Sequence, residues 1–252
     1  MFAKFWKTWV LDLEKSEASK IEEASLKDLE RIDQEAMKFE INLILIGGYA
    51  VRAYTEPRSW RFTKDIDFIT TIKDLIALRG VFQLLRYGFE QTEFGVKGSK
   101  KVNRESIELH ISVDKVIDWS TNLEYRLPED IFAKANKMHV KPYFEENREV
   151  KLSVMVASCE DVLIMKLMTE RTRDHFDAIA IILDSFEKVD IQRFWANSKQ
   201  SNLDQHIRKK LNSFLTDLKK GLVKKIWKEF TGREFIREQE VTLKESINKL
   251  LE

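Results

Sequence analysis

Hydrophobic positions follow a helical period in some parts of the chain and alternate with polar ones in others. Residues 3–40 have the helical period, and we expect two helical segments there. The second segment is predicted to begin with a capping box formed by Ser25 and Asp28. An aromatic stripe near the start is open to two interpretations, a packing layer or a partner surface; its members are Phe2, Phe5, Trp6 and Trp9.

The middle of the chain predicts strands interleaved with short helices. The apolar run 41–46 and residues 66–70 read as strands, with helices over 49–55 and 73–87. Alternating patterns over 89–96 and 105–113 predict a hairpin whose loop is residues 97–101, and the lysines there fit either a polar tip or an anion contact. A short helix from residue 128 to 137 and a second hairpin, over 139–144 and 149–155, complete this part.

Only helices are expected after Ser158, which can cap the helix that follows it. They span residues 159–171, 173–185 and a charged tail over 190–252. The pattern therefore predicts an α+β fold, with a mixed β-sheet flanked by helices and a C-terminal helical region. We divide it into an N-terminal helical extension (1–34), a catalytic core (35–157) and a C-terminal helical domain (158–252).

Composition excludes several classes of protein. Charged residues make up 34% of the 252 residues but cancel to a formal charge of +1, so any nucleic-acid contact must be local. The lone Cys159 excludes a disulfide framework and a cysteine-based zinc site, which fits a reducing, cytoplasmic environment. No apolar segment approaches the roughly 20 residues that a membrane helix needs, and we expect no signal peptide and no membrane contact.

Two short motifs carry the candidate chemistry. Gly47 and Gly48 end the first apolar run and open a helix, so bare backbone N–H groups at a helix N-terminus face an arriving anion such as a triphosphate. Asp65 and Asp67 follow at i, i+2 on a strand and project from one face, where two carboxylates can hold divalent cations. Ile66 then faces the core.

The order strand, Gly-Gly, helix and Arg-x-Thr-x-Asp-Ile-Asp-Phe resembles the DNA polymerase β-like nucleotidyltransferase superfamily, and within it the abortive-infection (AbiEii-like) toxin group and its uncharacterised relatives. The segment from Ser158 to Leu167 resembles that group's Ser-x-Glu-Asp-Leu-x-x-x-Lys-Leu pattern. Residues 171–177 resemble its Arg-Asp-x-x-Asp pattern. The resemblance spans about residues 35 to 185.

The resemblance implies a nucleotidyltransferase-type sheet and a Mg²⁺- or Mn²⁺-dependent transfer of a nucleoside monophosphate from a nucleoside triphosphate, ATP among them, to a hydroxyl. It makes a tRNA 3′ end or a protein hydroxyl the acceptor and a cognate antitoxin a partner. Two metal ions stabilise both ends of such a displacement, and Asp65 and Asp67 supply two ligands. Glu108 stands where the group places a third carboxylate, with Asp114 as the alternative and His110 as a base, a metal neighbour or a plain strand residue.

Basic residues complete the predicted site. Lys166 lies in an apolar helical turn, where its ammonium must reach water, an acid or a phosphate. The resemblance makes that partner a phosphate or an active-site acid, and snorkelling to the surface is the alternative. Arg173, Asp174 and Asp177 occupy the second downstream pattern, and Asp177 is expected to face the cleft and pair with Lys166. Arg61 can fork onto phosphate oxygens and Thr63 can donate its hydroxyl.

Three functions therefore compete. The first is nucleotidyl transfer to tRNA or protein, as the toxin of a toxin–antitoxin pair. The second is transfer to a small molecule such as an aminoglycoside, which a wide acidic cleft would favour. The third is a catalytically silent nucleotide-binding module, against which the intact Asp65 and Asp67 pair argues.

Overall fold

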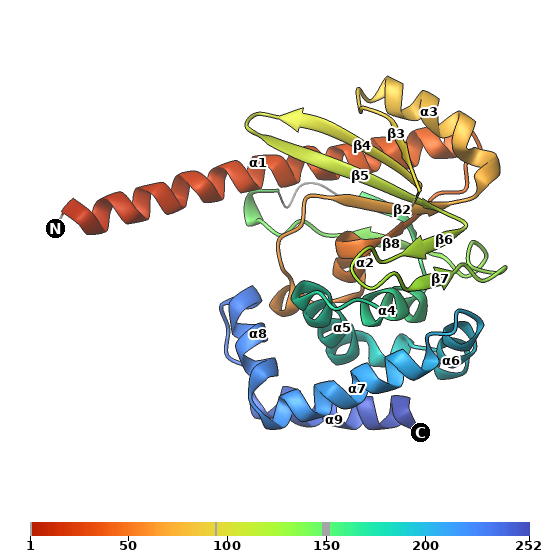
Figure 1. Cartoon of the computed structure of the whole chain (residues 1–252). Helices are drawn as coiled ribbons and strands as arrows, with labels where there is room; N and C mark the ends of the chain where they lie inside the picture. Colours follow the sequence, from red (N-terminus) through yellow and green to blue (C-terminus); the bar gives the residue numbers. More distant parts are fainter. Residues whose placement is uncertain (1, 94, 148–151) are drawn as a thin grey trace.

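A seven-stranded mixed sheet and a layer of helices make up the protein, as seen in a computed structural model (Figure 1). The structure describes residues 2–93, 95–147 and 152–252, and side chains from residue 16 onward in these ranges except that of residue 146. Two predictions therefore lie outside what is described. They are the side chains of the aromatic stripe (Phe2, Phe5, Trp6 and Trp9) and the strand residues 149–151.

The strands follow the predicted order, but the predicted strand 89–96 is divided between two strands, 90–92 and 95–102. The sheet order is β3-β4-β5-β2-β1-β9-β8; β2 runs parallel to β5 and β1 parallel to β9, while the other pairs are antiparallel. A separate hairpin, β6–β7, was not predicted. The strands are β1 (Ile44–Ile46), β2 (Ile66–Thr70), β3 (Glu90–Thr92), β4 (Gly95–Val102), β5 (Glu105–Val113), β6 (Lys115–Ile117), β7 (Glu124–Arg126), β8 (Asn136–Val140) and β9 (Leu152–Val156).

Helices flank this sheet and form the whole C-terminal region, which confirms the predicted α+β class. Figure 1 shows α4 to α9 gathered at the end of the molecule opposite α3. The helices are α1 (Phe2–Lys38), α2 (Gly47–Tyr54), α3 (Leu75–Leu84), α4 (Cys159–Leu167), α5 (Thr172–Ser185), α6 (Ile191–Gln200), α7 (Asp204–Lys219), α8 (Leu222–Thr231) and α9 (Arg237–Leu251). Among the described residues, no helix combines the length and apolar character needed to cross a membrane.

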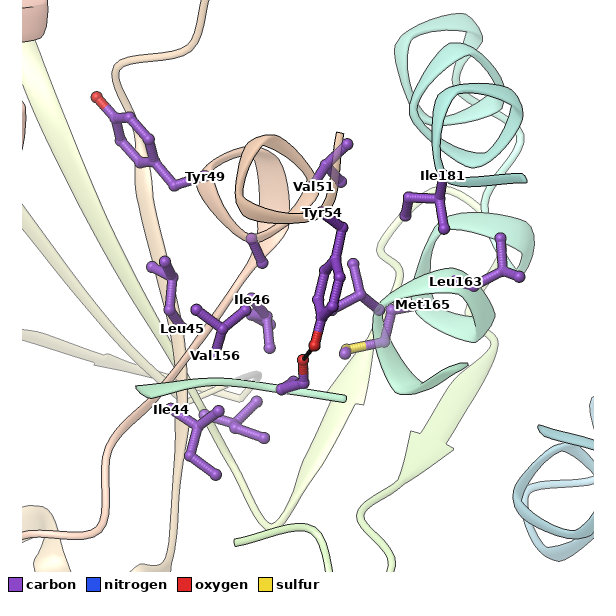
Figure 2. Close-up of a cluster of buried hydrophobic side chains, with 14 of the residues drawn as sticks. Ile44, Leu45, Ile46, Tyr49, Val51, Tyr54, Val156, Leu163, Met165 and Ile181 are labelled. Carbon is purple, nitrogen blue, oxygen red and sulfur yellow. Dashed lines mark hydrogen bonds between the residues drawn. The ribbon is translucent and has the colours of Figure 1, made fainter. Parts of the chain in front are cut away.

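The central core joins β1 to the helices. All three residues of β1 are buried, because strands on both sides and helices on its faces exclude water. Figure 2 shows Leu45 and Val156 from neighbouring strands near α2, and Leu163 and Ile181 from α4 and α5 on its other side. The Tyr54 hydroxyl donates to the Ala157 carbonyl at 2.7 Å, so the buried phenol is satisfied.

The predicted helix start at residue 25 is wrong, because α1 is continuous from Phe2 to Lys38. Ser25 is fully buried; its hydroxyl donates to the Lys64 carbonyl at 2.6 Å and accepts from Tyr49 at 2.9 Å. Asp28 accepts from Tyr87 at 2.9 Å and pairs with Lys100 at 2.8 Å. These polar residues serve tertiary contacts, which a local capping pattern cannot distinguish from a helix start.

The predicted hairpin loop at residues 97–101 and the predicted helix from residue 128 to 137 are also wrong. Lysines 97, 100 and 101 lie within β4, and the turn falls at Asn103, whose φ of +57° suits a tight reversal. Turns, rather than a helix, follow Pro128, because residues from Asn136 onward are committed to pairing with β9. Ser158 caps α4 as predicted, accepting from the Asp161 amide at 3.4 Å.

Of the two predicted domain limits, one falls inside a helix and the other falls between a strand and a helix. The limit after residue 34 lies inside α1, and the limit after residue 157 lies between β9 and α4. Buried apolar side chains form one cluster that includes residues from all three segments, such as Leu29, Phe68 and Trp227. The division into separate units remains a prediction.

A buried ion pair ties α1 to α2. Arg52 donates to Glu22 at 2.6 Å, and both side chains are almost fully buried. Glu22 also accepts the backbone amides of Tyr143 at 2.8 Å and Phe144 at 3.0 Å. Each charge is therefore compensated by its partner and by hydrogen bonds, which is the condition under which a buried pair is tolerated.

We predict that Glu22→Ala lowers the free energy of unfolding by about 3–5 kcal/mol, because it leaves the Arg52 charge buried and unpaired. Chemical denaturation measures the change. The matched control is Glu23→Ala, which breaks the exposed i,i+4 pair with Lys27 and should cost less than about 1 kcal/mol. Equal losses in the two variants would show that the buried pair has no special weight.

Candidate active site

One pocket of about 570 Å³ gathers most of the predicted site residues. It is lined by the start of α2, by β2, β4 and β5, by the β6–β7 hairpin and by α4 and the start of α5. Eight of the nine predicted residues line it: Gly47, Gly48, Arg61, Thr63, Asp65, Asp67, Glu108 and Lys166. The ninth, Asp177, is not among the lining residues.

The glycine pair allows α2 to start against the acids. Gly47 has a φ of +70°, and a Cβ there would lie 2.1 Å from Asp67 Oδ2. A Cβ on Gly48 would lie 2.9 Å from Thr63 Oγ1. Only glycine permits both the backbone angle and the close approach at position 47. No side chain accepts a capping hydrogen bond from the N–H groups in the first turn of α2.

The carboxylates come from two parallel strands. In the sheet, Asp67 is in register with Ile46 on one side and with His110 on the other. Asp65 directly precedes β2, and Glu108 lies two residues before His110 on β5. The predicted position of Glu108 beside the acid pair, on the adjacent strand, is therefore confirmed.

Asp65 carries the clearest electrostatic signature. Its Oδ1 atom is buried and has no hydrogen-bond partner. Burial raises the pKa of Asp65, and the negative charges of Asp67 and Glu108 raise it further. An oxygen without a donor, held among like charges, is an arrangement that a cation would stabilise.

Glu108 is engaged by basic partners. Its Oε2 lies 3.1 Å from Lys97 Nζ and 3.3 Å from His110 Nε2. Within the described ranges, no three His, Cys, Asp or Glu side chains are arranged to hold a metal ion together. The predicted sharing of one cation by Asp65, Asp67 and Glu108 is therefore not preassembled, because Lys97 and His110 hold the third carboxylate.

His110 connects two of these acids. Its Nδ1 lies 3.2 Å from Asp67 Oδ1. The hydrogen bond to Asp67 raises the pKa of His110 against the opposing effect of burial, and the charges of Asp67 and Glu108 add to the rise. The contacts with both acids indicate that His110 positions the two carboxylates.

Asp114, the alternative third carboxylate, does not line the pocket. It has a φ of +58° just past β5, and its Oδ1 accepts from the Ile72 amide at 3.3 Å. Because of this turn, Asp114 no longer follows the alternation of side chains along β5. Glu108 is thus the acid of β5 at the site.

The donor set fits a divalent cation such as Mg²⁺ or Mn²⁺ at Asp65 and Asp67. Both are hard oxygen ligands, which these cations prefer. The unpartnered Asp65 Oδ1 and the carboxylate of Asp67 beside Gly47 are the observations on which this fit rests.

A buried charge network backs the opposite wall. Lys166 Nζ lies 2.7 Å from Asp174 Oδ1 and 2.8 Å from Asp177 Oδ2. Burial acts to lower the pKa of Lys166, but the charges of Asp177 and Asp174 outweigh it and hold the pKa above its ordinary value. The predicted pairing of Lys166 with Asp177 is confirmed, and so is its placement in the same pocket as Asp65; snorkelling is excluded because the side chain is only 9% exposed.

Arg61 was expected to bind phosphate oxygens and Asp177 to face the cleft, and the structure places both differently. The Arg61 fork binds Asp177 through Nε at 2.8 Å and Nη2 at 2.7 Å, so these donors are not directed at a phosphate. Asp177 lies behind Arg61 and Lys166, and Asp174 is the acid that lines the pocket. Helical periodicity could not distinguish Asp174 from Asp177, because residues three apart lie on the same face of a helix and both contact the same buried network.

Several residues of the pocket escaped prediction, among them Asp118, Trp119 and Arg171. Asp118 and Trp119 lie in the loop of the β6–β7 hairpin, whose three-residue strands are too short for a period to be recognised. Arg171 also lines the pocket and lies 2.6 Å from Asp174. Arg171 begins the segment 171–177 that resembles the Arg-Asp-x-x-Asp pattern, and this resemblance was the signal that could have identified it.

Comparison with known families places these motifs in context. A family model described as "Nucleotidyl transferase AbiEii toxin, Type IV TA system" matches residues 32–249. The match includes both motif regions and extends into α9, so the predicted resemblance is confirmed. No curated protein matches the chain.

Three solved structures show a weaker likeness. They are a solution structure of the antibiotic-resistance factor ANT(2'')-Ia (TM-score 0.46, 15% identity, 73% of this chain and 97% of that one), a crystal structure of ANT(2'')-Ia with adenylyl-2''-tobramycin (0.34, 16%, 83% and 98%) and the lincomycin-bound lincosamide antibiotic adenylyltransferase LnuA (0.38, 16%, 62% and 94%). At these TM-scores the likeness carries no argument about substrate.

We predict that Asp65→Asn stabilises the metal-free protein at pH 7, by on the order of 1 kcal/mol. A carboxyl whose folded pKa is raised contributes stability at low pH that is lost as pH rises through that pKa, so the ionised form opposes folding at pH 7. Thermal unfolding with a chelator present measures the effect. A gain of stability that persisted unchanged down to pH 3 would contradict this origin.

Proposed function

We propose, from the premise that this chain belongs to the AbiEii family of nucleotidyltransferase toxins and is a nucleotidyltransferase, that it transfers a nucleoside monophosphate from a nucleoside triphosphate to the hydroxyl of a tRNA 3′ end or of a protein. The proposed role is that of a toxin, acting in the cytoplasm and paired with a cognate antitoxin. The supporting observation is the two-sided pocket in which a glycine-started helix and three carboxylates face a buried basic network.

The division of charge favours this reaction. Asp65, Asp67 and Glu108 come from β2 and β5, whereas Lys166 and Arg171 come from the α4–α5 segment. A triphosphate needs cations on one side and metal ligands on the other, because its charge is spread over many oxygens. The same pocket provides both.

A metal is proposed to bind at Asp65 and Asp67, where it would supply positive charge to the reacting phosphate and the attacking oxygen. The N–H groups of Gly47 and Gly48 and the hydroxyl of Thr63 are proposed to bind the phosphates. The Lys166 ammonium has three donors, and Asp174 and Asp177 account for two of them, which leaves one for a phosphate oxygen. Arg61 positions Asp177 and adds positive potential.

Glu108 is proposed to accept the proton of the acceptor hydroxyl. It lies on the pocket wall and is more than a third exposed, so a hydroxyl can reach it. His110 and Lys97 hold its carboxylate in place. This role suits its engagement by bases better than the role of a third metal ligand.

The lining favours a polyanionic or neutral acceptor over a polycation. Lysine or arginine occurs at five described lining positions, and aspartate or glutamate also at five. An aminoglycoside carries several ammonium groups and would gain most from an acidic cleft. Arg173, exposed at the rim of the pocket, adds a contact for an RNA backbone.

Incubation with each of the four α-³²P-labelled triphosphates and Mg²⁺ tests the proposal, with total RNA, a protein extract or an aminoglycoside mixture as the acceptor. We expect the label in RNA of tRNA size or in a protein band. Label on an aminoglycoside would redirect the acceptor, and absence of transfer with every triphosphate would overturn the proposal.

We predict that Asp65→Asn and Asp67→Asn each lower the rate of transfer by at least about a hundredfold, because the transition state loses a metal ligand worth several kcal/mol. Turnover is measured at saturating triphosphate. The matched control is Asp114→Asn, an acid of the same strand region outside the pocket, which should retain activity. Wild-type turnover in either site variant would show that the assigned acids are wrong.

Lys166→Met is expected to weaken triphosphate binding and to lower the free energy of unfolding by about 3–5 kcal/mol, because Asp174 loses a buried cation. Calorimetric titration with the triphosphate, below the melting temperature of the variant, separates the two effects. Unchanged affinity in the folded variant would leave Lys166 with a structural role alone.

A further inference from the structure

Trp119 combines two properties that rarely occur together. It lines the active-site pocket, and 66% of its surface is exposed. Burying so large an apolar surface is favourable, so a tryptophan left open at a binding site is an available contact for a ligand. By contrast, Trp60 and Trp227 are 8% and 1% exposed and belong to the interior.

The surroundings of Trp119 provide an apolar section of the pocket. Val116 and Ile117 of β6 line it, together with Met165 and Met168 from α4 and its end. Figure 1 shows the β6–β7 hairpin between the sheet and α4. Methionine side chains adapt to flat aromatic rings, which suits a planar ligand lying against the indole.

The loop that carries Trp119 is held in place by Asp118. One carboxylate oxygen of Asp118 accepts from Ser120 Oγ at 2.6 Å and from the backbone N and Oγ1 of Thr121 at 3.0 and 2.8 Å. The Asp118 amide donates to the Leu123 carbonyl at 3.0 Å. A platform that is ordered before binding loses little conformational entropy when a ligand arrives.

Asp118 also links this loop to the charged wall. Its other oxygen, Oδ1, is buried without a hydrogen-bond partner and lies 3.8 Å from Arg171 Nη2. Arg171 in turn pairs with Asp174, the acid that binds Lys166. The loop that carries Trp119 is thus linked to the wall where phosphates are proposed to bind.

We infer that Trp119 is the stacking platform for the nucleobase of the donor triphosphate, an inference that rests on the proposed function and specifies its nucleotide subsite. Every base has a π-face, so stacking retains all four nucleotides and distinguishes them from a bare polyphosphate. Val116, Met165 and Met168 contribute apolar surface to the same pocket. Asp118 is a positioning residue that acts through the loop.

Calorimetric titration tests the inference with two probes, the α,β-methylene analogue of ATP and inorganic tripolyphosphate, both with Mg²⁺. We expect Trp119→Ala to weaken binding of the ATP analogue about tenfold, the effect of losing one base–aromatic stack, and to leave tripolyphosphate binding unchanged. Trp119→Phe should recover most of the loss. The matched control is Phe39→Ala, which removes an exposed aromatic side chain outside the pocket.

The outcomes separate this inference from the function on which it rests. Equal affinity of Trp119→Ala and wild type for the ATP analogue would overturn the stacking role, even with transfer intact. A rise in KM confined to the acceptor would overturn the donor assignment and transfer the platform to the acceptor. A parallel loss of tripolyphosphate binding would show a disrupted site instead of a lost stack. Failure of the wild type to bind this analogue and the corresponding analogues of the other three triphosphates would overturn the proposed function and the inference together.

Discussion

The buried charge network around Lys166 is the interaction on which the site depends. Lys166 of α4 binds Asp174 and Asp177 of α5, and Asp177 binds the Arg61 fork from the segment before β2. Removing these charges from water is costly, and only their mutual pairing offsets the cost. The network therefore fixes the helical layer against the sheet, and with it the separation between the acidic and the basic walls of the pocket.

The acidic wall is arranged for function at the expense of stability. Asp65 has an unpartnered oxygen and a raised pKa, and Gly47 adopts a positive φ to bring α2 within contact of Asp67. Each feature opposes folding, because a buried donor-free oxygen and a flexible glycine both cost free energy. Such costs concentrate where a ligand restores the balance.

Charge pairing also assigns different tasks to residues of the same type. Glu108 is held by Lys97 and His110, while Oδ1 of Asp65 is buried and has no hydrogen-bond partner among the described residues, so the two acids differ in what they can still bind. A hairpin of two short strands brings Trp119 to the same pocket as these acids. Paired acids, a wall of charged side chains and an aromatic surface suit the binding of a nucleotide, which is charged at one end and planar at the other.

Local patterns determined much of this protein. Alternation placed Ile66 in the core and Asp67 on the open face, and the Gly-Gly and Asp-x-Asp motifs identified the family and most of the pocket. Only the tertiary structure decided that Asp174 faces the pocket while Asp177 lies behind it, and that Glu108, rather than the alternative Asp114, lines the pocket. It also converted Ser25 from a cap into a buried partner of Tyr49. The reason is physical: periodicity reports which side of an element is buried, whereas pairing between charges distant in sequence depends on how the elements pack.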